Sequence, residues 1–463
     1  MTEMPRLLWT PRAWLPQGWA HDVMLRVGAD GRWAEVTPGV LQPPAAAERL
    51  RGPLLPGLVN AHSHAFQRAF AGLAERRDRE SDDFWSWRDR MYQVALRITP
   101  DQLRAVATQL YVELLQGGYT HVCEFNYLQH DIDGSAYADP YTLSWALADA
   151  AADAGIGLTL MPALYERACF AQPQLRPDQR RFAMSPESAV IQARAIAAAG
   201  RPLLRSGLVV HSLRAAAAGS IHALRRLAAG IEGPIHIHAA EQTAEVDDCL
   251  AATGARPIEW LAREGLLDPR WQLVHATHTV PAEVEAVARS GAGVVLCPST
   301  EANLGDGLPD LRGWLAAGVP LAIGSDSHVT RDWREELRWL DYGQRLELRQ
   351  RNVSADAAAQ PSTAERLWGR VQGSSGAAAG EAAWGLVVGA RADALQADAR
   401  DPALLGMPWS HTLDALVFSS PGRPWADVMV AGRWVVRDGR HPRGEPIERG
   451  FVDAMTGLAT SGG

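Results

Sequence analysis

From residue 54 onward, short apolar runs alternate with longer amphipathic or alanine-rich segments. The apolar runs cover residues 54–64, 120–126, 157–165, 207–213, 234–242, 272–279, 292–300 and 319–328. Short apolar runs between turn signals are typical of buried strands, and the longer segments between them are typical of helices. This alternation predicts an α/β protein with a (β/α)8 TIM-like barrel. A doubly wound parallel sheet is the alternative.

The two ends of the chain differ from this alternation. Residues 1–54 carry short apolar segments broken by glycine and proline, which is typical of strands joined by turns. Near the other end, three more strand-like segments cover residues 386–392, 415–418 and 428–436. We therefore expect the barrel at residues 55–378 and a small discontinuous β-sandwich formed by residues 1–54 and 379–463.

Polar or ionisable side chains stand at the end of almost every apolar run. In chain order they are His62 and His64; Glu124 and Asn126; Tyr165; His211 and Arg214; His236, His238 and Glu241; His275 and His278; Ser299, Glu301 and Asn303; and Asp326 and His328. In a barrel the carboxyl ends of the strands share one rim, where enzymes of this fold build their active sites. A purely structural role would scatter such residues, so their concentration at the strand ends predicts a functional site.

Three of these residues point to a metal. His62 and His64 are two positions apart, so on a strand both imidazoles face the same side. With Asp326 at the end of the last run, they suggest a zinc-type site closed by distant parts of the chain. A His-x-His pair alone is weak, because histidines at strand ends are often ordinary hydrogen-bonded residues.

Composition and charge exclude several classes of function. The chain has 463 residues, 47% of them hydrophobic, which is enough for a large core. A net charge of −8 leaves no electrostatic footprint for nucleic acid or anionic membrane. The N-terminus lacks a signal peptide and no apolar run approaches about 18 residues, so we expect a cytoplasmic protein.

Two residue types narrow the chemistry further. The 4 cysteines form no CxxC pair, so neither a disulfide framework nor a cysteine zinc site is predicted. No lysine occurs anywhere in the chain. Its absence excludes Schiff-base chemistry, a phosphate-loop lysine and a two-metal centre bridged by a carbamylated lysine.

Several motifs resemble the amidohydrolase superfamily in its mononuclear deaminase branch. They are PGLVNAHSHAFQRAFAGLAE (56–75), FWSWRDRMY (84–92), HSLRA (211–215), HIHAAEQTAEVDDC (236–249), HATHT (275–279), CPSTEANLGDG (297–307) and GSDSH (324–328). The PGxxNxHxH pattern is common to the superfamily, whereas HSLR, HIHxxEQ and STEANLGDG are more specific. The resemblance spans nearly the whole chain. It implies a barrel of the amidohydrolase type and the hydrolytic deimination of N-formimidoyl-L-glutamate to N-formyl-L-glutamate and ammonia, in histidine degradation.

The resemblance also implies roles for the strand-end residues. The expected ligands of one divalent metal ion are His62, His64, His238 and Asp326. Zinc is the expected ion, although this donor set also suits iron and manganese. Glu241 would carry a proton from the attacking water to the departing nitrogen. His275 would hydrogen-bond the attacking oxygen or the tetrahedral centre, and Asp326 could also accept a proton.

A substrate with two carboxylates needs planar, bidentate donors, and Arg88 and Arg214 near the first and fourth strand ends could clamp it. The resemblance implies substrate contacts by Gln67, Arg88, Tyr127, His211 and Arg214. Taken alone, Arg88 is also explained as a solvated or aromatic-packed arginine.

Two alternative functions can be compared with this one. Another mononuclear deaminase, acting on a nucleobase-like ring amine, would leave the two arginines unexplained. A metal-binding scaffold or sensor without activity would predict the loss of Glu241 or of a ligand, and all are present. The expected partner is a small molecule, with neither nucleic acid nor membrane, and the resemblance favours a homodimer.

Overall fold

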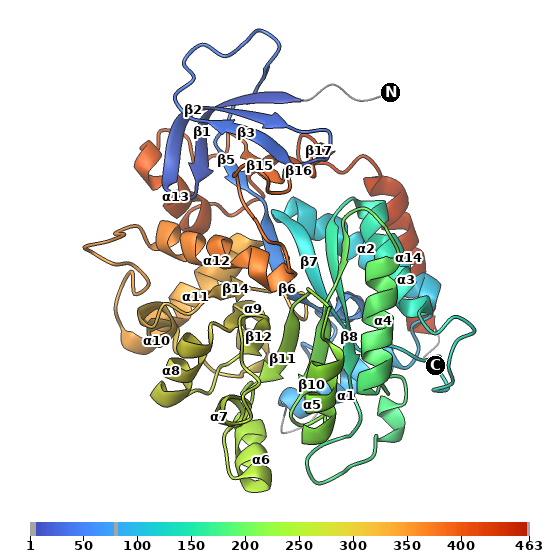
Figure 1. The fold of residues 1–463 in the computed structure, drawn as a ribbon. Helices are drawn as coiled ribbons and strands as arrows, with labels where there is room; N and C mark the ends of the chain where they lie inside the picture. The colour runs from blue at the N-terminus through green and yellow to red at the C-terminus, as the bar shows by residue number, and fades with distance from the viewer. Residues whose placement is uncertain (1–5, 78–81, 461–463) are drawn as a thin grey trace.

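The computed structural model describes residues 6–77 and 82–460. Within these residues, the larger part of the molecule is a nearly closed barrel of parallel strands (Figure 1). The barrel strands are β6 (Leu58–Ser63), β7 (Tyr119–Asn126), β8 (Gly157–Leu164), β10 (Leu208–Ser212), β11 (Ile235–Ala239), β12 (Trp271–His275), β13 (Gly293–Leu296) and β14 (Leu321–Ile323). Each overlaps one predicted run, so the predicted barrel is confirmed. A short strand that was not predicted, β9 (Leu204–Ser206), pairs with β8.

Helices connect the strands and cover the outside of the barrel (Figure 1). They are α2 (Pro100–Gln116), α3 (Thr142–Ala154), α4 (Pro186–Ala198), α5 (Ala218–Leu227), α6 (Thr243–Thr253), α7 (Pro257–Arg263), α8 (Pro281–Ser290), α9 (Pro298–Leu304), α10 (Leu311–Ala316), α11 (Trp333–Leu348) and α12 (Thr363–Ala379). The run predicted as a strand over 292–300 ends at Leu296, because Pro298 begins α9. Proline is favoured in the first helical turn, where its missing N–H costs nothing. No described helix is long and apolar enough to cross a bilayer.

The barrel closes where its first and last strands meet. The backbone N–H of Asp326 donates to His62 O at 3.0 Å, and that of His64 donates to Asp326 O at 3.3 Å. Asn60 adds two side-chain bonds to Ser325, at 2.7 and 2.9 Å. A Cβ atom on Gly324 would lie 2.6 Å from His62 Cβ, so this approach requires glycine. The two stretches that carry the predicted ligands are therefore held together by the backbone.

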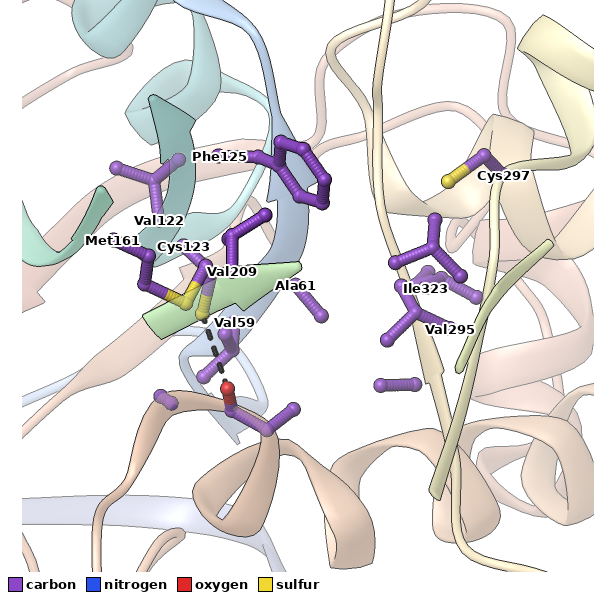
Figure 2. Close-up of a cluster of buried hydrophobic side chains, with 14 of the residues drawn as sticks. Val59, Ala61, Val122, Cys123, Phe125, Met161, Val209, Val295, Cys297 and Ile323 are labelled. Atoms are coloured by element: carbon purple, nitrogen blue, oxygen red, sulfur yellow. Dashed lines mark hydrogen bonds between the residues drawn. The ribbon is translucent and has the colours of Figure 1, made fainter. Parts of the chain in front are cut away.

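The barrel interior is packed and is not a channel. Figure 2 shows apolar side chains from several strands, among them Ala61, Met161 and Val209, which are all fully buried. Beneath them lies the last turn of α12, whose carbonyl groups accept hydrogen bonds from barrel side chains. These bonds run from Cys123 Sγ to Ala378 O at 3.4 Å, from His236 Nε2 to Ala378 O at 2.9 Å, and from Thr159 Oγ1 to Ala379 O at 2.8 Å. The end of α12 thus closes the barrel opposite the rim and has its free carbonyls satisfied.

Both ends of the chain pair in a second, smaller sheet, as predicted (Figure 1). Its strands are β1 (Leu7–Leu15), β2 (Gly18–Val27), β3 (Trp33–Thr37), β4 (Glu48–Arg49), β5 (Leu54–Pro56), β15 (Ala394–Ala397), β16 (Trp425–Val430) and β17 (Arg433–Val436). The two halves meet in the antiparallel pairing of β5 with β15, and hydrogen bonds join the strands into one sheet. The chain therefore leaves this sheet to build the barrel and returns to complete it.

Parts of the C-terminal region differ from the prediction. The segment 415–418 lies within a helix, α13 (Thr412–Phe418), and not in a strand, because its apolar side chains pack against α11 and α12. The segment 386–392 is irregular, and β15 begins just after it. The last element, α14 (Gly444–Thr460), packs along α2 on the barrel. Apolar runs of this length do not by themselves distinguish strand from helix.

The close approach of Gly324 to His62, at the seam where β6 and β14 meet, leads to a stability prediction. Gly324→Ala is expected to lower the free energy of unfolding by about 1–3 kcal/mol, because the new methyl group would overlap His62. The matched control is Gly369→Ala in α12, where a Cβ would meet no atom within 4 Å. This change should leave stability unchanged or raise it slightly, since alanine favours helix. Calorimetric unfolding of both variants checks the prediction, and equal midpoints would contradict it.

Candidate active site

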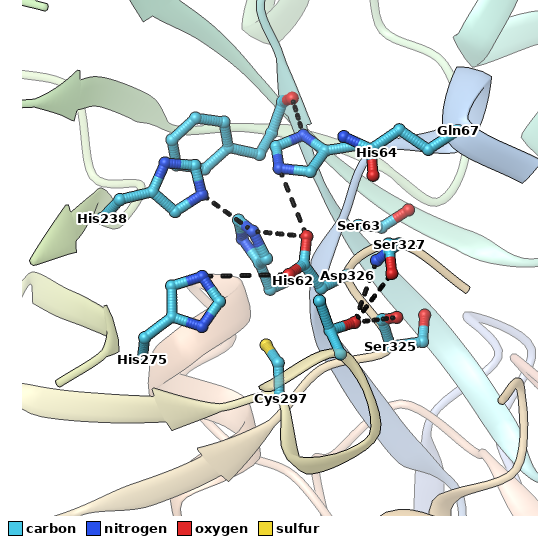
Figure 3. A network of polar contacts seen from close by, with 12 residues as sticks. His62, Ser63, His64, Gln67, His238, His275, Cys297, Ser325, Asp326 and Ser327 are labelled. Carbon is cyan, nitrogen blue, oxygen red and sulfur yellow. Dashed lines mark hydrogen bonds and ion pairs between the residues drawn. The ribbon is translucent and has the colours of Figure 1, made fainter. Parts of the chain in front are cut away.

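Three imidazoles and one carboxylate converge at the carboxyl end of the barrel (Figure 3). His62 Nε2 lies 3.1 Å from His238 Nε2 and 3.4 Å from Asp326 Oδ1. His64 Nε2 lies 3.5 Å from the same carboxylate oxygen. The four residues come from β6, from β11 and from the end of β14, and they are the four that the sequence analysis names as metal ligands.

The chemistry of this donor set fits a divalent metal ion. His64 Nδ1 lies 3.0 Å from the carbonyl oxygen of Phe125, which can only accept, so Nδ1 carries the proton and Nε2 offers its lone pair. Burial and the neighbouring His62 lower the pKa of His64 to about 3. Burial also lowers the pKa of His62 and of His238 well below the ordinary value. Neutral imidazoles with converging nitrogens are what metal binding requires.

His275 has a different environment from the other three histidines. Its Nε2 lies 3.6 Å from Glu241 Oε1 and 3.8 Å from Asp326 Oδ2, and its Nδ1 lies 3.3 Å from Glu301 Oε1. Burial alone would lower the pKa of His275, but the carboxylates of Glu241, Glu301 and Asp326 raise it to about 10. The ring is therefore a charged donor with both nitrogens protonated.

Glu241 is buried beside His275 and beside Arg214, whose guanidinium lies 3.8 Å from Glu241 Oε2. Burial raises the pKa of Glu241 to about 7, although His275 and Arg214 act to lower it. A carboxyl group with a pKa near neutrality can both take up and release a proton, which suits general acid–base catalysis.

The backbone at the strand ends is strained. Non-glycine residues with positive φ lie at or just beyond the ends of β11, β12 and β14: Ala240 (54°), His275 (70°), Ala276 (49°), Asp326 (43°) and His328 (66°). Such conformations cost on the order of 1–3 kcal/mol each and persist only where the surrounding structure enforces them. Their clustering at the rim marks the same site that the side chains mark.

A pocket opens beside these residues. It is lined by His64, Gln67, Phe84, Trp87, Arg88, Met91, Tyr92, Tyr127, Tyr165, Phe182, His211, Arg214, His238, Glu241, His275, Leu304 and Asp326. The set includes all five residues named in the sequence analysis as substrate contacts. Among them, Gln67 Nε2 donates to the Tyr127 hydroxyl at 3.1 Å. Of the named site residues, His62 alone does not line the pocket, and it is fully buried.

Two guanidinium groups face the pocket with unused donors. Arg214 is only 7% exposed, and Arg88 packs over the rings of Trp85 and Tyr92, at 4.6 and 5.6 Å. Arg88 thus packs against aromatic rings, as one of its two interpretations from the sequence predicted, and it also lines the pocket. The Nε atoms of both arginines are buried and have no hydrogen-bond partner among the described residues. Two cations with unsatisfied donors favour an anionic ligand with planar acceptor groups.

One wall of the pocket was not predicted from the sequence, apart from Arg88. This wall is the helix α1 (Phe84–Ala95), which contributes Phe84, Trp87, Met91 and Tyr92 besides Arg88. Counted from Phe84, the others follow after three, four, seven and eight residues, Arg88 included. This helical periodicity could have identified them. Glu301 was noted only as a strand-end residue, without a role. Phe182 lies in a segment that carries no recognisable motif.

Comparison with known proteins places the chain among amidohydrolases. Residues 54–435 match the model of the amidohydrolase family, and residues 6–52 match the N-terminal domain of formimidoylglutamate deiminase HutF. The chain is 48% identical over 454 residues to formimidoylglutamate deiminase of Pseudomonas aeruginosa, covering 97% of this chain and 98% of that protein. It is 28% identical over 428 residues to a 5-methylthioadenosine/S-adenosylhomocysteine deaminase of Desulfovibrio desulfuricans, covering 90% and 89%.

Solved structures show the same architecture. An amidohydrolase from Brucella melitensis matches with a TM-score of 0.92 and 40% identity over 98% of this chain and 100% of that one. An adenosine deaminase from Xanthomonas campestris with bound zinc matches with a TM-score of 0.78 and 23% identity over 98% of each chain. The second likeness concerns the fold alone.

The paired guanidiniums lead to a binding prediction. Glutarate, with two carboxylates, is expected to raise the unfolding midpoint. At 100 times its Kd it should add about 2.7 kcal/mol to the free energy of unfolding. Arg214→Met should abolish this shift, because it removes a cation from the pocket. Arg400→Met, at an arginine whose side chain is 85% exposed, should preserve it. Butyrate serves as the ligand control, and an equal shift with glutarate and butyrate would refute the prediction.

Proposed function

The chain belongs to the amidohydrolase family, and from this premise we propose that it hydrolyses N-formimidoyl-L-glutamate to N-formyl-L-glutamate and ammonia, in histidine degradation. The observation that carries this function is the 48% identity, over 97% of the chain, to a formimidoylglutamate deiminase. The match of residues 6–52 to the N-terminal domain of the same enzyme agrees with it. The guanidiniums of Arg88 and Arg214, which both line the pocket, suit a substrate with two carboxylates. A ring amine would offer neither guanidinium a carboxylate.

We propose that His62, His64, His238 and Asp326 hold one metal ion, and that this ion is zinc. The neutral imidazoles and the converging Nε2 atoms support this assignment. A divalent ion in such a site supplies a water that is activated for attack near neutral pH. The protein contributes the fixed geometry, since the seam between β6 and β14 positions three of the four ligands.

Glu241 is the proposed proton carrier. Its pKa near neutrality lets it accept a proton from the attacking water and then deliver that proton to the departing nitrogen, which leaves as ammonia. His275 is the proposed stabiliser of negative charge, because its raised pKa favours the charged ring and its Nε2 lies near Glu241 and Asp326. Asp326, one of the four proposed ligands, is also proposed to accept a proton.

Five other residues of the pocket are proposed to bind the substrate. Arg88 and Arg214 would pair with its carboxylates, and Gln67, Tyr127 and His211 would orient the formimidoyl group near the metal ligands. The hydrogen bond from Gln67 to Tyr127 and the ring contact of Tyr127 with His64, at 4.9 Å, support this placement. The homodimer and the cytoplasmic location stay predictions from the sequence.

Release of ammonia from N-formimidoyl-L-glutamate by the purified protein tests the function directly. Efficient turnover is expected, with about one metal ion per chain on the same sample. N-formimidoyl-L-aspartate should react poorly, because its shorter chain cannot reach both cations and the reacting centre together. Turnover of adenosine but not of the formimidoyl amino acid would contradict the proposal and favour a ring deaminase.

Substitution of the proton carrier gives a second test. Glu241→Gln is expected to lower kcat by about 10²- to 10⁴-fold, because the amide cannot transfer the proton. The bound metal content should stay the same, since Glu241 is not a proposed ligand. Glu187→Gln, at an exposed carboxylate of α4, is the matched control and should keep full activity. A variant at Glu241 with wild-type kcat would exclude it as the proton carrier.

A further inference from the structure

Two tyrosines of the pocket share one buried amide. Gln179 Nε2 lies 3.0 Å from the Tyr165 hydroxyl and 3.3 Å from the Tyr92 hydroxyl. Gln179 is 1% exposed and each tyrosine is 4% exposed, and both tyrosines line the pocket. None of the three has a place in the function proposed above. They join distant parts of the chain, since Tyr92 lies on α1, Tyr165 follows β8, and Gln179 ends a short 3-10 turn, Pro177–Gln179.

The orientation of the Gln179 amide is fixed by the backbone. The backbone N–H of Arg176 donates to Gln179 Oε1 at 3.0 Å. A backbone N–H can only donate, so the oxygen of the amide must face Arg176 and the NH2 group must face the tyrosines. Gln179 therefore donates one hydrogen bond to each hydroxyl, and each phenol oxygen acts as an acceptor towards it.

This arrangement leaves the phenols as donors towards the pocket. A phenol has a single proton, and no acceptor for the protons of Tyr92 and Tyr165 occurs among the described residues other than the two hydroxyls themselves. Without a ligand, one proton can bridge the two hydroxyls, and a carboxylate with several acceptor positions can take both protons. Burial, with the neighbouring Tyr92, raises the pKa of Tyr165 well above its ordinary value, so this phenol keeps its proton.

The donors lie beside the two cations of the pocket. The Arg88 guanidinium lies 5.6 Å from the centre of the Tyr92 ring, and the charges of Arg214 and Arg88 both act on Tyr165. Both tyrosine rings also contact Phe182, at 5.4 and 5.5 Å, which restricts their movement. A carboxylate offers about four acceptor positions, and a bidentate arginine fills only two of them. In a buried pocket the other positions need donors as well.

We propose that Tyr92 and Tyr165 donate hydrogen bonds to a carboxylate of the substrate beside Arg88 and Arg214, and that Gln179 is the positioning residue that turns both phenols into donors. The inference rests on the proposed function, because it takes the substrate to be a dicarboxylate. It assigns to the pocket a second layer of anion recognition, supplied by neutral groups. These groups favour a charged acceptor over a carboxamide, because hydrogen bonds to charged acceptors are stronger.

Kinetics of four variants test the proposal. Tyr165→Phe and Tyr92→Phe are each expected to raise KM for N-formimidoyl-L-glutamate roughly 10-fold or more, with kcat within about 3-fold of wild type. Gln179→Glu should raise KM further, because the new carboxylate would accept the phenol protons and repel the substrate. Tyr119→Phe is the matched control, since it removes a buried hydroxyl outside the pocket and should leave KM unchanged. The unfolding midpoint and the metal content of each variant show whether its fold and metal site are intact.

A comparison of acid and amide substrates separates recognition from a merely structural effect. The amide substrates are the N-formimidoyl derivatives of L-glutamine and L-isoglutamine, each of which lacks one carboxylate. One of the two amides lacks the carboxylate that the tyrosines are proposed to bind. For that amide, the preference for the acid, measured as kcat/KM for the acid divided by kcat/KM for the amide, should be smaller in Tyr165→Phe than in wild type. A structural defect would lower both values alike. Unchanged KM values in both tyrosine variants, or unchanged ratios for both amides, would overturn the inference.

The inference can fail separately from the proposed function. If the wild-type protein releases no ammonia, the proposed function fails, and calorimetric binding of glutarate then decides the inference. Weaker binding by Tyr165→Phe than by wild type and Tyr119→Phe supports the carboxylate subsite. Equal binding by all three, or no binding by wild type, overturns it.

Discussion

The active site depends on the backbone contact that closes the barrel between β6 and β14. Hydrogen bonds from His64 and Asp326 cross this seam, and Gly324 allows the two strands to approach. Three of the four proposed metal ligands lie on the two sides of the same contact. The geometry of these ligands is therefore set by the main chain. Any separation of β6 from β14 would move His62 and His64 away from Asp326.

Charge in the site is arranged in two zones. His62, His64 and His238 are buried among one another and stay neutral, because burial and mutual repulsion oppose their protonation. His275 lies on the other side, among three carboxylates that favour its charged form. Glu241 connects this acidic group to Arg214 and so to the pocket. The proposed metal ligands, the proposed proton carrier and the proposed anion-binding arginine thus follow one another over a few side chains.

The barrel and the convergence of the candidate ligands could be predicted because both depend on local rules. Alternate residues on a strand face one side, and the carboxyl ends of barrel strands share a rim, so position alone placed His62, His64, His238 and Asp326 on that rim. Their choice as the four ligands came from the family resemblance. The rest depends on contacts between distant segments. The run 415–418 became a helix because other helices cover it. Gln179 has no motif, and its importance appears only when its amide is seen between two tyrosines.

The pairing of β5 with β15 also determines when the fold can be completed. β5 continues through Gly57 into β6, the strand that carries His62, but its neighbour β15 lies more than three hundred residues further along the chain. During synthesis, which proceeds from the N-terminus, the first sheet must wait with an unpaired edge while the whole barrel emerges. The small sheet is therefore begun before the barrel is translated and completed only after it. The β15-facing edge of β5 gains its partner only after the barrel segment has been made.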